Sequence, residues 1–192
     1  AIVHCAAKLR VALKDKLLLF TFRTKAEGGK VALAHEEYLH FIRTVLATDC
    51  ADLIDIEFFT AGAELPALIE EAHTAGAAVV CSSHDFHKTP PRTELVSRMM
   101  QMQRAGADLP KLAVMPQSRA DVLELLAATA EMADRHPETP IITMSMGALG
   151  AVSRLSGEAL GSAMTFANPG QASAPGQVSL EVVNEVLDAL HL

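Results

Sequence analysis

The sequence predicts a parallel α/β fold, either a (β/α) barrel or an open doubly wound sheet. Three observations support this prediction. Short apolar segments recur along the chain, and segments with helical periodicity lie between them. Successive apolar segments begin roughly 20 to 35 residues apart, which is the length of a βα unit. The 192 residues, 50% of them hydrophobic, are enough for one domain with a sizeable core.

The predicted strands are apolar almost throughout and do not alternate with polar residues. Strands of parallel sheets have this character because helices cover both of their faces. Turn residues bracket each segment. The expected strands are Leu17–Phe22, Leu53–Phe58, Ala78–Ser82, Leu112–Met115, Ile141–Met146 and Ala163–Phe166.

Helical periodicity predicts the connecting elements. Residues 1–14 place their apolar side chains on one face, as an amphipathic helix does. Ser118 and Asp121 have the spacing of an N-terminal capping arrangement. The other expected helices are His35–Thr48, Glu64–Ala75, Thr93–Ala105, Ser118–Arg135 and Leu180–Leu190. The chain has neither GxGxxG nor GxxxxGK[ST], which disfavours a nucleotide-binding sheet.

Composition argues against several classes of partner. The net charge is −7, no basic stripe stands out and aromatic residues make up 4%, so nucleic acid and anionic membranes are poor candidates. No apolar run approaches the roughly 20 residues of a membrane span. Cys5, Cys50 and Cys81 have no short paired spacing, which indicates reduced thiols and a cytoplasmic protein.

Lys111 stands out because it heads the apolar run Lys111-Leu-Ala-Val-Met-Pro116. A lysine at the start of a strand usually extends its ammonium group to solvent and has no further role. Burial, in contrast, favours the neutral amine, which is the nucleophile that condenses with ketones. Strand alternation places Lys111, Ala113 and Met115 on one face, where the small Ala113 leaves room for the long side chain.

Other polar residues follow the predicted strands, at the ends where βα-barrel enzymes carry their chemistry. His84 is suited to general acid–base catalysis because histidine titrates near neutral pH. The neighbouring Asp85 either orients His84 or caps the next turn. The remaining candidates are Arg23, Glu27, Arg154, Ser173 and Gln177.

Simpler interpretations exist for several of these residues. Arg23 and Arg154 can equally be surface ion-pair partners, and Glu27, beside two glycines, can be a solvated turn residue. His84 and His87 form an HxxH pair with the spacing of metal ligands. A zinc site, however, needs three or four ligands, and no third candidate has recognisable spacing, so we expect no metal.

Taken together, the chain resembles type I 3-dehydroquinate dehydratase, also called type I dehydroquinase. The matching stretches occur in the family's order across nearly the whole chain, and together they are highly specific. They are Leu18-Leu-Phe-Thr-Phe-Arg23 with Glu27-Gly-Gly29, Asp55-Ile-Glu57, Ser83-His-Asp-Phe86, Lys111-Leu-Ala-Val-Met-Pro-Gln117, Thr143-Met-Ser-Met146 with Ser153-Arg154, and Ala172-Ser-Ala-Pro-Gly-Gln177.

The resemblance implies a (β/α)8 TIM barrel and a hydro-lyase of the shikimate pathway, which leads to chorismate and the aromatic amino acids. Such an enzyme converts 3-dehydroquinate to 3-dehydroshikimate by syn elimination of water, without a metal or cofactor, and is commonly a homodimer. Lys111 would form an imine with the substrate ketone, His84 would transfer protons, Glu27 would orient the histidine and Arg154 would bind the substrate carboxylate. Further substrate contacts would come from Arg23, Ser173 and Gln177, and apolar walls from Phe86, Met144, Met146 and Phe166.

The chain departs from the family pattern at its beginning. Only six of the eight barrel strands are evident, because nothing before Leu17 matches the family's first two strands. We therefore expect residues 1–192 to form a single (β/α) barrel domain that is truncated at its N-terminus relative to the family. Two other functions stay open: a Schiff-base aldolase or transaldolase on the same barrel, and a non-catalytic remnant that binds ligand without turnover.

Overall fold

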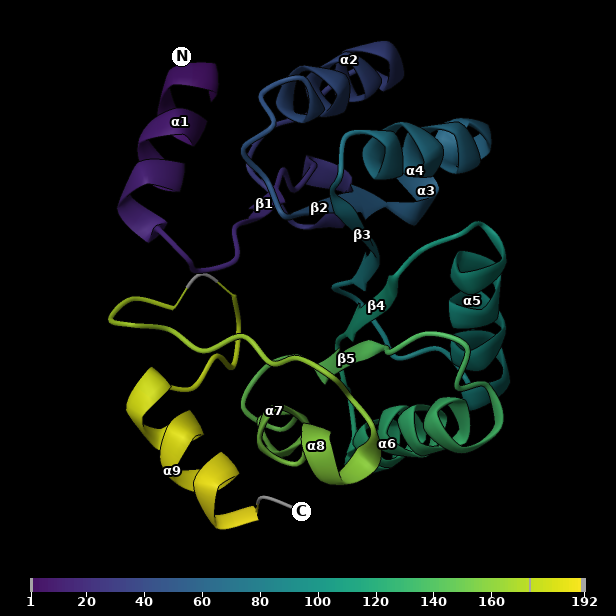
Figure 1. The fold of residues 1–192 in the computed structure, drawn as a ribbon. Helices are drawn as coiled ribbons and strands as arrows, with labels where there is room; N and C mark the ends of the chain where they lie inside the picture. Colours follow the sequence, from purple (N-terminus) through teal and green to yellow (C-terminus); the bar gives the residue numbers. More distant parts are fainter. Residues whose placement is uncertain (1, 173, 191–192) are drawn as a thin grey trace. The chain divides into compact units, whose positions relative to one another are not determined.

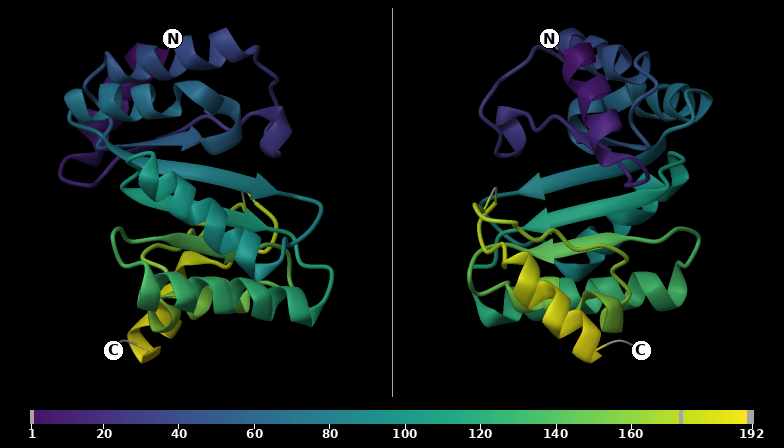
Figure 2. Two further views of the ribbon diagram at one scale, coloured as in Figure 1. Left: turned by 90° about the vertical axis from the view of Figure 1, so that its right-hand side faces the viewer. Right: turned by 60° about the vertical axis from the view of Figure 1, so that its left-hand side comes forward.

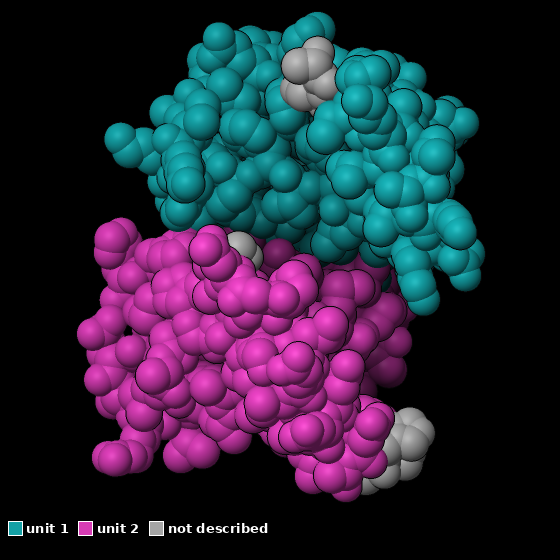
Figure 3. All heavy atoms as spheres, turned by 90° about the vertical axis from the view of Figure 1, so that its left-hand side faces the viewer, with its two compact units in different colours: residues 1–83, 102–108 teal, residues 84–101, 109–192 magenta. Residues whose placement is uncertain are grey.

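The structure is a computed structural model, and it describes residues 2–172 and 174–190 (Figure 1). The chain divides into two compact units, which Figure 3 shows in different colours. The first unit comprises residues 1–83 and 102–108, and the second comprises residues 84–101 and 109–192. Each unit contains parallel strands and helices. That residues 1–192 act as one barrel domain stays a prediction.

The first unit is built on parallel strands. Its strands are β1 (Leu19–Thr21), β2 (Leu53–Glu57) and β3 (Ala78–Asp85), the last two residues of β3 belonging to the second unit. Leu19 pairs with Leu53, and Leu53 pairs with Ala78. Every residue of β2 is buried, as expected for a strand whose two faces are both covered.

Helices cover these strands. They are α1 (Ile2–Leu13), α2 (His35–Leu46), α3 (Phe58–Ala61) and α4 (Leu65–Thr74), with the short 3-10 helices η1 (Lys25–Glu27) and η2 (Gly62–Glu64). Figure 1 shows α2 and α4 side by side. Ile42 of α2 and Leu68 of α4 are fully buried, as are Ile54 and Ile56 of β2. The regularly spaced apolar side chains of these helices and strands thus form the core of this unit.

The second unit contains β4 (Leu109–Val114) and β5 (Ile142–Ser145), which pair in parallel with Lys111 beside Ile142 and Ala113 beside Met144. Its helices are α5 (Arg92–Arg104, its last turn in the first unit), α6 (Arg119–Arg135), α7 (Val152–Leu155), α8 (Gly157–Leu160) and α9 (Leu180–Leu190). In Figure 2, α6 lies along the strands of this unit, and it packs against β5. The predicted cap of α6 is confirmed: the Ser118 hydroxyl accepts a hydrogen bond from the Asp121 amide.

The expected elements are confirmed with one exception. The segment Ala163–Phe166 is not a regular strand, so the described residues contain five strands and not six. It begins beside β5, where the Ala163 amide donates to the Ile141 carbonyl at 2.8 Å, and Ile141 and Ser162 form a single parallel bridge. A single bridge is not a strand ladder.

The four-residue helices α3, α7 and α8 were not predicted, because four residues are too short to show a period of 3.6. None of the described helices has the length and hydrophobicity needed to cross a membrane.

An ion pair joins α1 to the strand layer of the first unit. The Asp52 carboxylate, at the entrance to β2, accepts hydrogen bonds from the Leu18 amide at 2.6 Å and from the Arg10 guanidinium. These two interactions lower the pKa of Asp52 below its usual value, the Leu18 bond being the larger cause. The carboxylate therefore has to be ionised to hold α1 and the start of β1 in place.

We expect Asp52→Asn to destabilise the fold at pH 7, and to do so less as the pH falls toward 3. Because the pKa of Asp52 is lower in the folded chain, the ionised carboxylate stabilises the fold above its unfolded pKa of about 3.9, and this contribution is lost as the pH falls further. Urea unfolding of both proteins between pH 7 and pH 3 measures the difference. Asp15→Asn, at an exposed carboxylate near the same junction, serves as the control. A difference that persists unchanged at pH 3 contradicts this account.

Candidate active site

A buried arginine, Arg154, follows the last strand of the second unit. The turn after β5 is tight, because a Cβ added at Gly150 would lie 2.3 Å from the Ser145 carbonyl oxygen. The Ser153 hydroxyl closes this turn by accepting from the Ser145 amide at 2.8 Å and donating to the Gly150 carbonyl at 2.7 Å. The turn leads into α7 and directs Arg154 inward, where only 2% of the residue is exposed.

The Arg154 guanidinium has no acidic partner among the described residues. Its Nη1 contacts the Met144 sulfur at 3.4 Å, and its Nη2 donates to the Pro175 carbonyl at 3.3 Å. The Nε atom has no hydrogen-bond partner there. Burial lowers the pKa of Arg154. A buried cation without a counter-ion is costly, so this position is suited to an anionic ligand such as a carboxylate.

Lys111 lies in β4 and is 6% exposed. The interpretation as a lysine that extends to solvent is therefore wrong. Its Nζ atom lies 4.7 Å from the centre of the Phe166 ring, which is within the range of a cation–π interaction. Lys111 and Ala113 point to the same face of β4, and Ala113 pairs with Met144 of β5. The amine and the Met144 side chain that Arg154 contacts therefore share one face of this strand pair.

His84 is the last but one residue of β3 and is half-buried. The carboxylate of the neighbouring Asp85 accepts hydrogen bonds from the amides of His87 and Lys88 at 2.9 and 3.0 Å. Asp85 therefore caps the turn that follows β3. No cluster of three or more His, Cys, Asp or Glu side chains within the described part of the chain could hold a metal ion.

In the first unit, Arg23 and Glu27 lie in the segment after β1. Glu27 is 5% exposed, so the interpretation as a solvated turn residue is wrong. The fold of this segment depends on Gly29, where an added Cβ would lie 1.8 Å from the Arg23 carbonyl oxygen. The Arg23 Nη1 and the Glu27 Oε2 are 3.4 Å apart. The two glycines of the motif thus allow a compact turn that buries the carboxylate.

Arg23 is surrounded by carboxylates, unlike Arg154. Its Nη2 donates to Asp55 at 2.8 Å, and its Nη1 donates to Glu57 at 2.9 Å and to the Ser82 hydroxyl at 3.0 Å. Burial alone would lower the pKa of Arg23, but Asp55, Glu57 and Glu27 outweigh it, and the pKa is raised. Arg23 is therefore a partly buried ion-pair partner and not a surface one.

Asp55, Glu57 and Ser82 had no predicted function. A signal for the first two was present, because carboxylates two residues apart in an otherwise apolar strand must share a face. Ser82 precedes the His84 motif and left no such signal. Its hydroxyl donates to Asp55 at 2.6 Å.

The family model described as type I 3-dehydroquinase matches residues 1–192. The chain belongs to this family. The 3-dehydroquinate dehydratase of Klebsiella pneumoniae is 50% identical to it over 189 residues, which are 98% of this chain and 75% of that protein. The resemblance found in the sequence is thereby confirmed.

Solved structures give the same assignment for the fold. The type I 3-dehydroquinate dehydratase of Clostridium difficile, solved with covalently modified comenic acid, has a TM-score of 0.94 at 46% identity and covers 98% of this chain and 74% of that chain. The 3-dehydroquinate dehydratase of Geobacillus kaustophilus also has a TM-score of 0.94, at 39% identity, and covers 98% of this chain and 73% of that chain. The βα-barrel fold class predicted from the sequence is confirmed.

The remaining candidates of this type I 3-dehydroquinase belong to the second unit, some of them to its last loop. The backbone at Gly176 has a φ of 74°, and an added Cβ would lie 2.3 Å from the Gly147 carbonyl oxygen, so the loop packs closely against the end of β5. The Gly147 amide donates to the Pro175 carbonyl at 3.2 Å, the same oxygen that Arg154 contacts. Gln177 follows directly and is half-buried. Phe86 and Phe166 are half-buried, and Met146 is 1% exposed. Ser173 lies outside the described residues.

Proposed function

We propose that this chain converts 3-dehydroquinate to 3-dehydroshikimate through an imine on Lys111. The family membership and the dehydratase relatives support a hydro-lyase of the shikimate pathway. One observation carries the proposal on structural grounds. The buried Lys111 amine shares a strand face with Met144, and Met144 contacts an arginine that lacks an acidic partner among the described residues. A substrate with both a ketone and a carboxylate matches these two groups.

In the proposed reaction, the neutral Lys111 amine attacks the substrate C3 carbonyl, and water leaves to form the protonated imine. His84 then takes the C2 proton, and the electron pair of that C–H bond moves toward the imine nitrogen. The pair returns as the C1–OH bond breaks, and His84 gives its proton to the departing hydroxyl. Water finally hydrolyses the imine and frees Lys111. Each step uses only side chains and water.

Two features around Lys111 support this sequence of steps. Burial disfavours the ammonium form and so favours the amine that must attack. Once the imine is protonated, its positive charge lies where the Nζ atom does, over the face of Phe166. The negative face of an aromatic ring stabilises such a charge. The site therefore favours both the neutral nucleophile and the cationic intermediate.

The two arginines suit different parts of the substrate. Arg154 has no counter-ion in the described part of the chain, so we assign it to the substrate carboxylate, which its planar guanidinium can bind with two hydrogen bonds. Arg23 already has three carboxylates around it, which disfavours a further anion and suits hydroxyl groups. We assign further contacts to Ser173 and Gln177, apolar walls to Phe86, Met144, Met146 and Phe166, and orientation of the histidine to Glu27.

We further propose that the protein is a cytoplasmic homodimer. The reduced state implied by its unpaired cysteines supports the first part, and the family resemblance supports the second. Size-exclusion chromatography with light scattering measures the oligomeric state directly, and a monomer at micromolar concentration contradicts the dimer.

Borohydride reduction tests the imine. Sodium borohydride added with 3-dehydroquinate is expected to convert the imine to a stable secondary amine, and peptide mass spectrometry should find the added mass on Lys111. The same reaction without substrate is the control and should leave Lys111 unmodified. An adduct on another lysine, or none, contradicts the proposal, and formation of an aldol cleavage product in place of the conjugated enone favours the aldolase alternative.

A further inference from the structure

We propose that Glu57 is a positioning residue that fixes the guanidinium of Arg23 for substrate binding. The inference rests on the proposed function and deepens it, because it concerns how one of the assigned substrate contacts is held. Glu57 is the last residue of β2 and is fully buried. It therefore acts through its neighbours.

The Glu57 carboxylate receives four hydrogen bonds. Its Oε1 accepts from the Arg23 Nη1 at 2.9 Å and from the Thr24 amide at 2.8 Å. Its Oε2 accepts from the Thr24 hydroxyl at 2.7 Å and from the Thr60 hydroxyl at 2.5 Å. All four partners are donors, so the site matches an ionised carboxylate, which only accepts. The Glu57 side chain thus binds both the guanidinium of Arg23 and the backbone amide of Thr24.

A hydrogen bond to helix α2 also fixes the position of Glu57. Its backbone amide donates to the Tyr38 hydroxyl at 2.8 Å, and Tyr38 of α2 is fully buried. Burial raises the pKa of Tyr38, so the phenol stays neutral, and its hydroxyl oxygen accepts from this amide. A helix of the unit therefore holds the end of β2, and the end of β2 holds Arg23.

The geometry leaves Arg23 little freedom. Its Nη1 is shared between Glu57 and Ser82, and its Nη2 is bound to Asp55. Displacing a substrate-binding group by about 1 Å can cost about 100-fold in rate. Loss of the Glu57 contact leaves Ser82 and the more distant Glu27 as the partners of Nη1, and it also removes the carboxylate that Thr24 binds.

The test is a double-mutant cycle on kcat and KM with Glu57→Gln and Arg23→Met. In Glu57→Gln the side-chain NH2 group replaces one carboxylate oxygen, so a donor faces the donors that this oxygen accepts from in the parent chain. We expect Glu57→Gln to lower kcat/KM by about 10- to 100-fold, the effect of losing a charge-assisted hydrogen bond, mainly through KM. In the Arg23→Met background the same change should have little further effect, because contacting residues are not additive. Additive losses mean a merely structural role and overturn the proposal.

Glu71→Gln is the matched control. Glu71 also pairs with an arginine of the same unit, Arg43, but both side chains are exposed. This pair shares no hydrogen bond with Arg23 or Glu57. We expect unchanged kcat and KM in this variant. Thermal unfolding of each protein separates loss of fold from loss of position.

A second measurement does not depend on turnover. Nitrogen-15 NMR of the arginine side chains should show restricted rotation of the Arg23 guanidinium in the parent chain and in Glu71→Gln, and faster rotation in Glu57→Gln. Unchanged Arg23 rotation in folded Glu57→Gln overturns the positioning role. Absence of a borohydride adduct in the parent chain, with the NMR result as expected, overturns the proposed function alone.

Discussion

Lys111→Met is expected to abolish turnover of 3-dehydroquinate, with kcat lowered by about 10⁴-fold or more, as when a covalent nucleophile is removed. The borohydride adduct should disappear with it. The variant should remain folded, because an apolar side chain of similar length takes a position that is only 6% exposed. Steady-state kinetics, mass spectrometry and urea unfolding measure the three effects.

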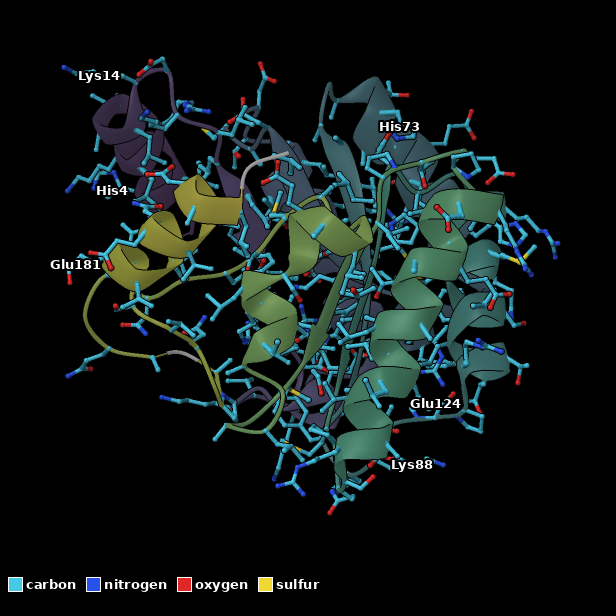
Figure 4. The ribbon with its side chains drawn as sticks, turned by 90° about the horizontal axis from the view of Figure 1, so that it is seen from below. His4, Lys14, His73, Lys88, Glu124 and Glu181 are labelled. Atoms are coloured by element: carbon cyan, nitrogen blue, oxygen red, sulfur yellow. The ribbon has the colours of Figure 1, made fainter. Side chains whose placement is uncertain are left out.

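Lys88→Met provides the control for this prediction. Lys88 is an exposed lysine of the same unit, and Figure 4 labels it at the edge of the molecule. We expect its replacement to change neither kcat nor the adduct. If Lys111→Met keeps more than about 1% of the turnover, the imine mechanism is wrong, because no other nucleophile should reproduce this one.

The second prediction concerns the two arginines, whose replacement should change stability in opposite directions. Arg154→Met should lower kcat/KM by about 10²- to 10³-fold, because a desolvated charge contact with the substrate carboxylate is lost. The same change should stabilise the free protein by about 1 kcal/mol or more, since it removes a 2% exposed cation that has no acidic partner among the described residues.

Arg23→Met should instead destabilise the fold by about 3 to 5 kcal/mol, because removing one partner leaves buried carboxylates without their cation. Asp55 and Glu57 are fully buried, and both pair with Arg23. Urea unfolding of the two variants beside the parent chain measures both changes. Destabilisation by Arg154→Met of the same size would mean that this guanidinium has an unrecognised counter-ion, and it would remove the main structural support for the carboxylate site.

The strands and helices were largely predictable because their signals are local. Near-continuous apolar runs predicted β1 to β5, and periodicity of 3.6 predicted α1, α2, α4, α5, α6 and α9. Ala163–Phe166 is also apolar but is not a strand; beside it, a single bridge joins Ser162 to Ile141, the residue before β5. A strand needs a partner along its length. Pairing of that kind depends on residues distant in the sequence, which composition does not encode.

The candidate site was also predictable only in part. The residue types and their order made Lys111, His84, Glu27 and Arg154 candidates, and the family match agrees with the resemblance that suggested their roles. The sequence left the environment of each residue open, so Glu27 as a solvated turn residue and Lys111 as a solvent-reaching lysine were reasonable alternatives. Only burial, which depends on packing between elements, rejected them.

The sequence by itself determined the fold class, the family and the residue types available for an imine mechanism, because these depend on composition, period and motif order along the chain. The tertiary structure decided that Arg23 lies among three carboxylates and that Arg154 has none among the described residues. Two arginines that look alike in the sequence thus differ in charge environment. The physical reason is that electrostatic partners such as Asp55 and Glu57 come from another strand, more than 30 residues away along the chain, and only folding brings them within hydrogen-bond distance.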